Sequence, residues 1–75
     1  MKKNFAALLI FLLLNYVLLD KGGLISVYEE PDLSSPVIET NISVRLLPDA
    51  DQKSLKTGIR VESKEALHNI LEDLR

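Results

Sequence analysis

The sequence predicts an α+β protein in which a hydrophobic leader precedes a small sheet of three or four strands packed by two helices. Three observations support this fold class: an uninterrupted apolar run near the N-terminus, a segment of strict apolar and polar alternation, and a C-terminal segment with apolar residues at helical spacing. A chain of 75 residues has room for one small core. We therefore expect a leader at residues 1–15 and one domain at residues 16–75.

The leader has the arrangement of a secretory signal, since Lys2 and Lys3 precede ten apolar residues, Phe5–Leu14. The lysines should stay in the cytoplasm, which places the domain outside it. No small-x-small cleavage triplet follows, so we expect Phe5–Leu14 to remain as a membrane anchor. Two alternatives stay open: a cleaved signal that releases a secreted domain, and a buried helix in a soluble protein.

Two apolar runs, residues 16–19 and 24–28, are separated by a turn that contains Gly22 and Gly23. This pattern predicts a β-hairpin, because glycine readily adopts the positive φ angles of a tight turn. After a proline-containing loop, alternation predicts a strand over residues 38–46, with one face toward the core. That face would carry Ile38, Thr40, Ile42, Val44 and Leu46.

The C-terminal part predicts a helix, a short extended segment and a second helix. Pro48 and the acids after it suit the first turn of a helix, and Gly58 suits the position just past its end. Residues 59–61 are extended, and Ser63 suits the N-cap of the last helix. The expected element order is β-β-β-α-(β)-α. The expected common core consists of Ile38, Ile42, Val44, Leu67, Ile70 and Leu71.

The composition argues against catalysis and against nucleic-acid binding. The chain has no cysteine and one histidine, so thiol chemistry, a zinc-thiolate site and a hydrolase triad lack their residues. Beyond the two lysines of the leader, 7 of the 9 basic residues remain against 11 acidic ones, without the cluster that phosphates require. We therefore expect no enzyme activity, cofactor, metal site, small-molecule substrate or nucleic-acid ligand.

Two sets of titratable residues have ordinary structural explanations. Asp49 and Asp51 lack the glycine and the distal glutamate of a calcium loop, so we interpret them as acids at a helix start. His68 precedes Glu72 by one helical turn, where an i,i+4 pair can form. A role of His68 in pH-dependent binding is the alternative.

A sheet this small cannot cover its own edges, so we expect binding by surface contact with a protein partner. The candidate surfaces are the strand edge at residues 59–61 and the last helix. The residues predicted to contact the partner are Ile59, Val61, Glu62, Glu65 and His68.

Three stretches of the sequence, residues 23–31, 47–59 and 61–74, resemble the C-terminal domain of the bypass-of-forespore protein BofC. The similarity includes Gly23-Leu-Ile-Ser-Val-Tyr28, the Gly58-Ile59 pair and the helix start at Ser63-Lys64. It implies an exported, sporulation-associated regulator in an endospore-forming Gram-positive bacterium. Such a regulator acts by contact on a signalling serine protease in a sigma-factor checkpoint. The family fold resembles an RNA-recognition fold without the sheet aromatics that bind RNA, which agrees with this sequence.

Full-length members of that family carry a β-rich domain between the signal and this region, whereas here the leader runs directly into the hairpin. Two functions are therefore considered. One is a membrane-tethered regulatory module that binds an extracytoplasmic protein. The other is a small structural membrane subunit whose leader helix packs with a larger membrane protein. The leader contains no glycine, hence no Gly-x-x-x-Gly packing face, which favours the first.

Overall fold

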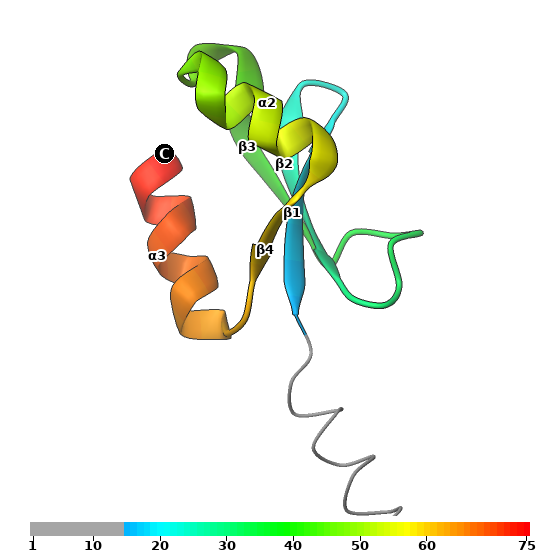
Figure 1. Cartoon of the computed structure of the whole chain (residues 1–75). Coiled ribbons are helices and arrows are strands. Elements are labelled where there is room, and N and C mark those ends of the chain that lie inside the picture. Colours follow the sequence, from blue (N-terminus) through cyan, green and yellow to red (C-terminus); the bar gives the residue numbers. More distant parts are fainter. Residues whose placement is uncertain (1–14) are drawn as a thin grey trace, which may run out of the picture.

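The computed structural model describes residues 15–75, which form a four-stranded antiparallel sheet and two α-helices (Figure 1). In chain order the elements are β1 (Tyr16–Lys21), β2 (Leu24–Glu29), β3 (Ile38–Ser43), the 3-10 turn η1 (Val44–Leu46), α2 (Asp49–Thr57), β4 (Ile59–Val61) and α3 (Lys64–Leu74). The strands lie in the order β3-β2-β1-β4. The predicted α+β domain and its element order are confirmed. The leader predicted at residues 1–15 lies outside the described residues, except for Asn15.

The predicted hairpin is formed by β1 and β2, with Gly22 and Gly23 as its two turn residues. Both glycines have positive φ angles, 63° and 91°, as a two-residue turn between right-twisted strands requires. The Asp20 carboxylate accepts a hydrogen bond from the Gly23 N–H at 2.8 Å. This bond closes the turn and sets the register of the hairpin.

Strand β3 contains a bulge that the alternation of its residues does not reveal. Leu24 pairs with Ser43, whereas Ser26 pairs with Glu39, so two steps along β2 correspond to four steps along β3. The Thr40 hydroxyl donates to a backbone carbonyl of β2 across this irregularity, at 2.7 Å. Because two extra residues preserve the alternation of faces, the sequence pattern looks like that of a regular strand.

The prediction of a strand over residues 38–46 is wrong after Ser43, because the backbone turns there into η1. The Val44 N–H donates to the Gly23 carbonyl at 2.9 Å, and the chain then closes a 3-10 turn. The side chain of Val44 stays buried, but Leu46 is 79% exposed. Leu46 therefore does not belong to the inward face that the alternation predicted.

The core lies between one face of the sheet and both helices, so that Leu55 of α2 and Leu67 of α3 belong to the same cluster. Its buried members are Tyr16, Leu18, Ile25, Val27, Ile42, Val44, Leu55, Val61 and Leu67. Of the six expected core residues, three are buried members, and Ile70 and Leu71 pack against the cluster while partly exposed. The prediction that Ile38 belongs to the core is wrong. Ile38 begins the edge strand β3, which has a strand neighbour on one side only, and its side chain is 42% exposed.

Gly58 connects α2 to β4 at a point where the backbone comes very close to β1. Its φ angle is 109°, and its N–H donates to the Ser54 carbonyl at 2.8 Å, which ends the helix as predicted. A Cβ atom at this position would lie 2.9 Å from Cγ1 of Val17 and 3.4 Å from Cδ2 of Leu19. Glycine is therefore required here both for its backbone conformation and for the close approach of the chain to β1.

We expect Gly58→Ala to lower the free energy of unfolding by about 1–3 kcal/mol, because it adds backbone strain and a contact with Val17. Urea unfolding of the full chain in mild detergent, followed by circular dichroism, measures this change. Gly22→Asn is the matched control, since nothing lies within 4 Å of a Cβ there and Asn tolerates its φ angle. Equal losses in the two variants would contradict the close approach at Gly58.

The loop between β2 and β3 contains a local carboxylate turn. The hydroxyl and the N–H of Ser34 donate to Asp32 Oδ1 at 2.5 and 2.9 Å. These two bonds, the hydroxyl foremost, hold the pKa of Asp32 below its ordinary value of 3.8, because they stabilise the charged form. The two hydrogen bonds in this loop therefore depend on the ionisation of Asp32, and so on the pH.

The depressed pKa of Asp32 predicts a small stabilisation of the folded state above the unfolded-state pKa of 3.8, lost as the pH falls through the folded-state pKa. Ser34→Ala should raise the pKa of Asp32 toward 3.8. An NMR titration of the Asp32 carboxyl carbon measures this value. Ser35→Ala, which removes a neighbouring hydroxyl, should leave it unchanged; the same pKa in the Ser34→Ala variant as in the parent would contradict the prediction.

Candidate docking surface at strand β4 and helix α3

The predicted partner-binding surface begins at β4, which forms one edge of the sheet. Within residues 15–75, β4 pairs only with β1, with Val61 opposite Tyr16 and Ile59 opposite Leu18. The outer side of its backbone therefore has no strand neighbour in the described part of the chain. A free edge of this kind can take up an extended segment of a partner.

The two apolar side chains of β4 pack on the core and are not exposed to a partner. Val61 is 6% exposed and belongs to the core cluster, and Ile59 packs partly buried against it. What β4 offers a partner is thus its backbone edge. The prediction that Ile59 and Val61 contact a partner stays a prediction, and it concerns their main chain.

The three polar residues of the predicted surface are all exposed: Glu62, Glu65 and His68. The first two lie at the start of α3, where the N-cap determines the backbone conformation. The Ser63 hydroxyl accepts a hydrogen bond from the Ala66 N–H at 3.0 Å, which confirms Ser63 as the N-cap. Glu65 lies in the first turn of α3, where a negative charge interacts favourably with the helix dipole. The surface at this end of α3 therefore carries two carboxylates on either side of Lys64, and the cap holds it in place.

An open hollow of about 570 Å³ lies between β4 and α3. Its lining consists of Asn15, Arg60, Val61, Glu62, Ser63, Ala66 and Ile70. Val61 and Glu62 thus meet in one hollow, whereas Glu65, His68 and Ile59 are not part of its lining. The contributions of Asn15 and Arg60 were not predicted, because they come from segments that only the folded sheet brings together. The i,i+4 spacing of Ala66 and Ile70, which puts both on one helix face, was the one sequence signal that could have indicated this hollow.

Arg60 alternates with the two core-facing residues of β4 and points to the opposite face of the sheet. Arg60 pairs with Val17 of β1 in the strand register. Its Nη2 atom lies 3.3 Å from Oε2 of Glu30. Because Glu30 follows β2, this ion pair spans β1 from β4. The Arg60 side chain of this pair is exposed and that of Glu30 is half-buried, so the pair adds little to stability, but it engages the charge of Arg60. No comparable ion pair reaches Glu62 or Glu65 among residues 15–75.

His68 makes no ion pair with Glu72 in the described part of the chain. The carboxylate of Glu72 lies instead 3.6 Å from Nε of Arg75. Asp49 and Asp51 both lie in the first turn of α2, as expected for helix-start acids. Residues 15–75 contain no group of three or more metal-ligating side chains that could hold an ion.

Across residues 15–75, no helix has both the length and the apolar character needed to cross a membrane. The predicted anchor, Phe5–Leu14, lies outside the described residues. Membrane retention accordingly stays a prediction from the sequence.

Comparison with known proteins bears on the resemblance noted in the sequence. No match was found among curated proteins or among solved structures. The family model described as the BofC C-terminal domain matches residues 14–75. The match includes every strand and helix described above, from β1 to α3. The chain therefore belongs to the BofC C-terminal domain family, whose members are regulatory proteins of sporulation.

Proposed function

We propose that this protein is a non-enzymatic regulator that is anchored in the membrane or exported and binds an extracytoplasmic protein partner. The observation that carries the proposal is the edge of β4 without a strand neighbour, beside an open hollow and the exposed carboxylates of Glu62 and Glu65. By resemblance to the family, the partner is a sporulation signalling protease. The surface formed by the β4 edge, Glu62 and Glu65 is the proposed contact.

The backbone edge of β4 and the carboxylates of Glu62 and Glu65 have different roles in the proposed contact. The backbone of β4 can hydrogen-bond an extended segment, which supplies affinity without requiring exposed apolar side chains. Glu62 and Glu65 act mainly on encounter, because exposed charges steer a partner of opposite sign and raise its association rate. A partner with a basic, extended segment fits both features.

Reversing both charges, Glu62→Lys with Glu65→Lys, should weaken association and lower its rate by about tenfold at low salt. The fold should stay intact, because both side chains are exposed. Pull-downs from sporulating and vegetative cells compare the partners retained by the parent and the variant, and circular dichroism checks folding.

Glu39→Lys with Glu72→Lys is the control for this reversal, because it changes the net charge equally at exposed positions outside the surface. Unchanged partners and rates with the first pair of substitutions would rule out the proposed contact. Turnover of a peptide or an ester by the purified chain would overturn the non-enzymatic assignment. Retention of a larger membrane protein by the leader alone would support the structural-subunit alternative.

The basic start and the apolar run of the leader predict export with retention in the membrane. A reporter fused after Arg75 should be active only outside the cytoplasm, and the chain should stay at full length in the membrane fraction. Leu8→Arg with Leu9→Arg, which interrupts the apolar run, should abolish both results. Release of a chain shortened by about 20 residues would show a cleaved signal instead.

A further inference from the structure

The chain between the proposed membrane anchor and the folded domain is very short. Asn15 alone separates Leu14, the last residue of the apolar run, from Tyr16, which begins β1 and belongs to the buried core. The two residue steps from Leu14 to Tyr16 span at most about 7 Å. The headgroup layer on each side of a bilayer is about 5–8 Å thick. An anchor that ends at Leu14 therefore brings the Asn15 end of the domain into contact with the headgroups.

The loop between β2 and β3, residues 30–37, begins at this same end of the sheet. The Glu30 N–H donates to the Asn15 carbonyl at 2.9 Å. The loop then returns to β2, where the Val37 N–H donates to the Val27 carbonyl at 2.7 Å. Figure 1 shows the loop beside the start of β1, on the side away from α3. Both attachments thus hold the loop near the residue at which the domain begins.

Large apolar side chains are exposed on and next to this loop. Leu33 is 48% exposed, Val37 is 54% exposed, and the following residue, Ile38, is 42% exposed. These three are the majority of the five large apolar residues found exposed in residues 15–75, and they lie within six positions of one another. An apolar side chain at this level gains free energy when it leaves water for the boundary between headgroups and acyl chains.

Two carboxylates near these side chains already have partners within the domain. Oε2 of Glu30 lies 3.3 Å from Nη2 of Arg60, and Asp32 accepts two hydrogen bonds from Ser34. Both carboxylates can stay among the hydrated headgroups while the apolar side chains reach deeper. Because an anionic surface repels carboxylates, the loop favours zwitterionic headgroups.

The anchor makes a small apolar contact sufficient. Two or three exposed side chains are too few to bind a free domain to a bilayer, because association costs translational and rotational freedom. In an anchored chain the loop is already at the surface, so its effective concentration toward the lipid is high.

We propose that residues 30–37 form a membrane-contact loop, which inserts the side chains of Leu33 and Val37 into the lipid surface beside the anchor. The occupant of this apolar patch is thus the bilayer itself. The proposal rests on the membrane-anchored form of the proposed function and adds an orientation to it. The strands lead away from the membrane, and the hairpin turn at Gly22 and Gly23 is farthest from it.

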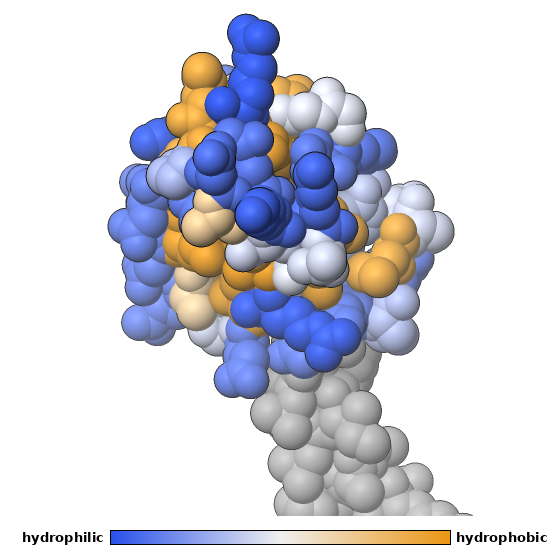
Figure 2. Space-filling view, turned by 45° about the horizontal axis from the view of Figure 1, so that its top comes forward, coloured by the Kyte–Doolittle hydropathy of each residue, from blue (hydrophilic) through white to orange (hydrophobic). Residues whose placement is uncertain are grey.

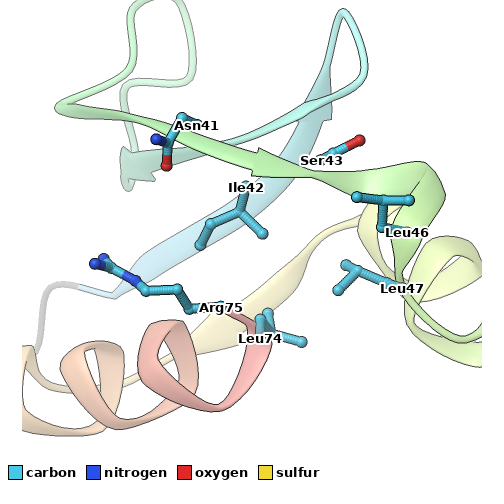
Figure 3. Close-up of a pocket in the computed structure, with 7 residues that line it drawn as sticks. All are labelled: Asn41, Ile42, Ser43, Leu46, Leu47, Leu74 and Arg75. Carbon is cyan, nitrogen blue, oxygen red and sulfur yellow. The ribbon is translucent and has the colours of Figure 1, made fainter.

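Exposed apolar side chains at the other end of the sheet provide internal references. Leu24, which follows the hairpin turn, is 42% exposed, and Leu46 is 79% exposed. In Figure 2, where the top of Figure 1 is turned toward the viewer, apolar side chains reach the surface between hydrophilic ones. Leu46 lines an open hollow of about 320 Å³ together with Ser43, which pairs with Leu24 (Figure 3). Leu24 and Leu46 therefore match the loop residues in exposure but lie away from Asn15.

The test uses the full chain in nanodiscs of zwitterionic phosphatidylcholine, labelled at the methyl groups of Leu and Val and observed by NMR. A small fraction of the lipids carries a nitroxide at the start of the acyl chain, which broadens the signals of nearby methyl groups. Leu33 and Val37 should be broadened about tenfold more than Leu24, because the length of β2, about 17 Å, separates the two ends of the sheet. Leu46 should behave like Leu24.

A double variant assigns the lipid contact to the two side chains. Leu33→Asp with Val37→Asp should reduce the broadening of the backbone N–H signals of Ser34 and Ser35 by about fivefold, because the new carboxylates stay in water. Leu24→Asp is the matched control and should leave these signals unchanged. All three replaced side chains are exposed, so the substitutions should not disturb folding.

Equal broadening at Leu33, Val37 and Leu24 in the nanodisc-bound chain would overturn this inference and leave the anchor intact. Undiminished broadening in the double variant would also refute it. A chain that elutes apart from the nanodiscs in size-exclusion chromatography would rule out the proposed anchor, and the membrane-contact loop with it. Shifts of the Leu33 and Val37 signals that grow with the number of chains per disc, without broadening by the lipid, would assign the patch to a second copy instead.

Discussion

The position of β1 between β2 and β4 is the constraint on which the rest of the structure depends. Leu18, which is fully buried, stands opposite Val27 on one side and Ile59 on the other. Leu55 of α2 closes the same cluster and is also fully buried. The chain can return from α2 to this central strand only because Gly58 allows its backbone to approach Val17. A side chain at that point would push β4 away from β1, and α3 follows β4.

The parts of the fold that depend on local chemistry were predictable from the sequence. Paired glycines predict the hairpin turn, and Ser63 predicts the start of α3, because each acts on backbone groups within a few residues. The end of β3 was not predictable in this way. It depends on a bulge against β2 and on a hydrogen bond from Val44 to Gly23, two residues far apart in the sequence. The exposure of Leu46 follows from that turn.

The candidate docking surface was also predictable from the sequence only where local chemistry determines it. Glu62 and Glu65 follow from their place beside a helix cap, and both are exposed as a polar flank should be. A strand of three residues carries too little alternation to show which side chains face the core, so the burial of Val61 was not foreseen. Arg60 reaches Glu30 across β1, and no pattern in either segment indicates that pairing.

Helix α3 carries charged residues of both signs at each end, and few of its residues are buried. Leu67 is its one buried residue, while Ile70, Leu71 and Leu74 pack partly exposed. Leu67→Ala would therefore loosen the docking surface at β4 and α3, because it removes the buried contact that orients the helix. A substitution at Glu62 would act on the surface charge alone, since its side chain is exposed. Loss of partner binding with an intact fold would thus report the surface charge, whereas loss of binding together with stability would report the packing of α3.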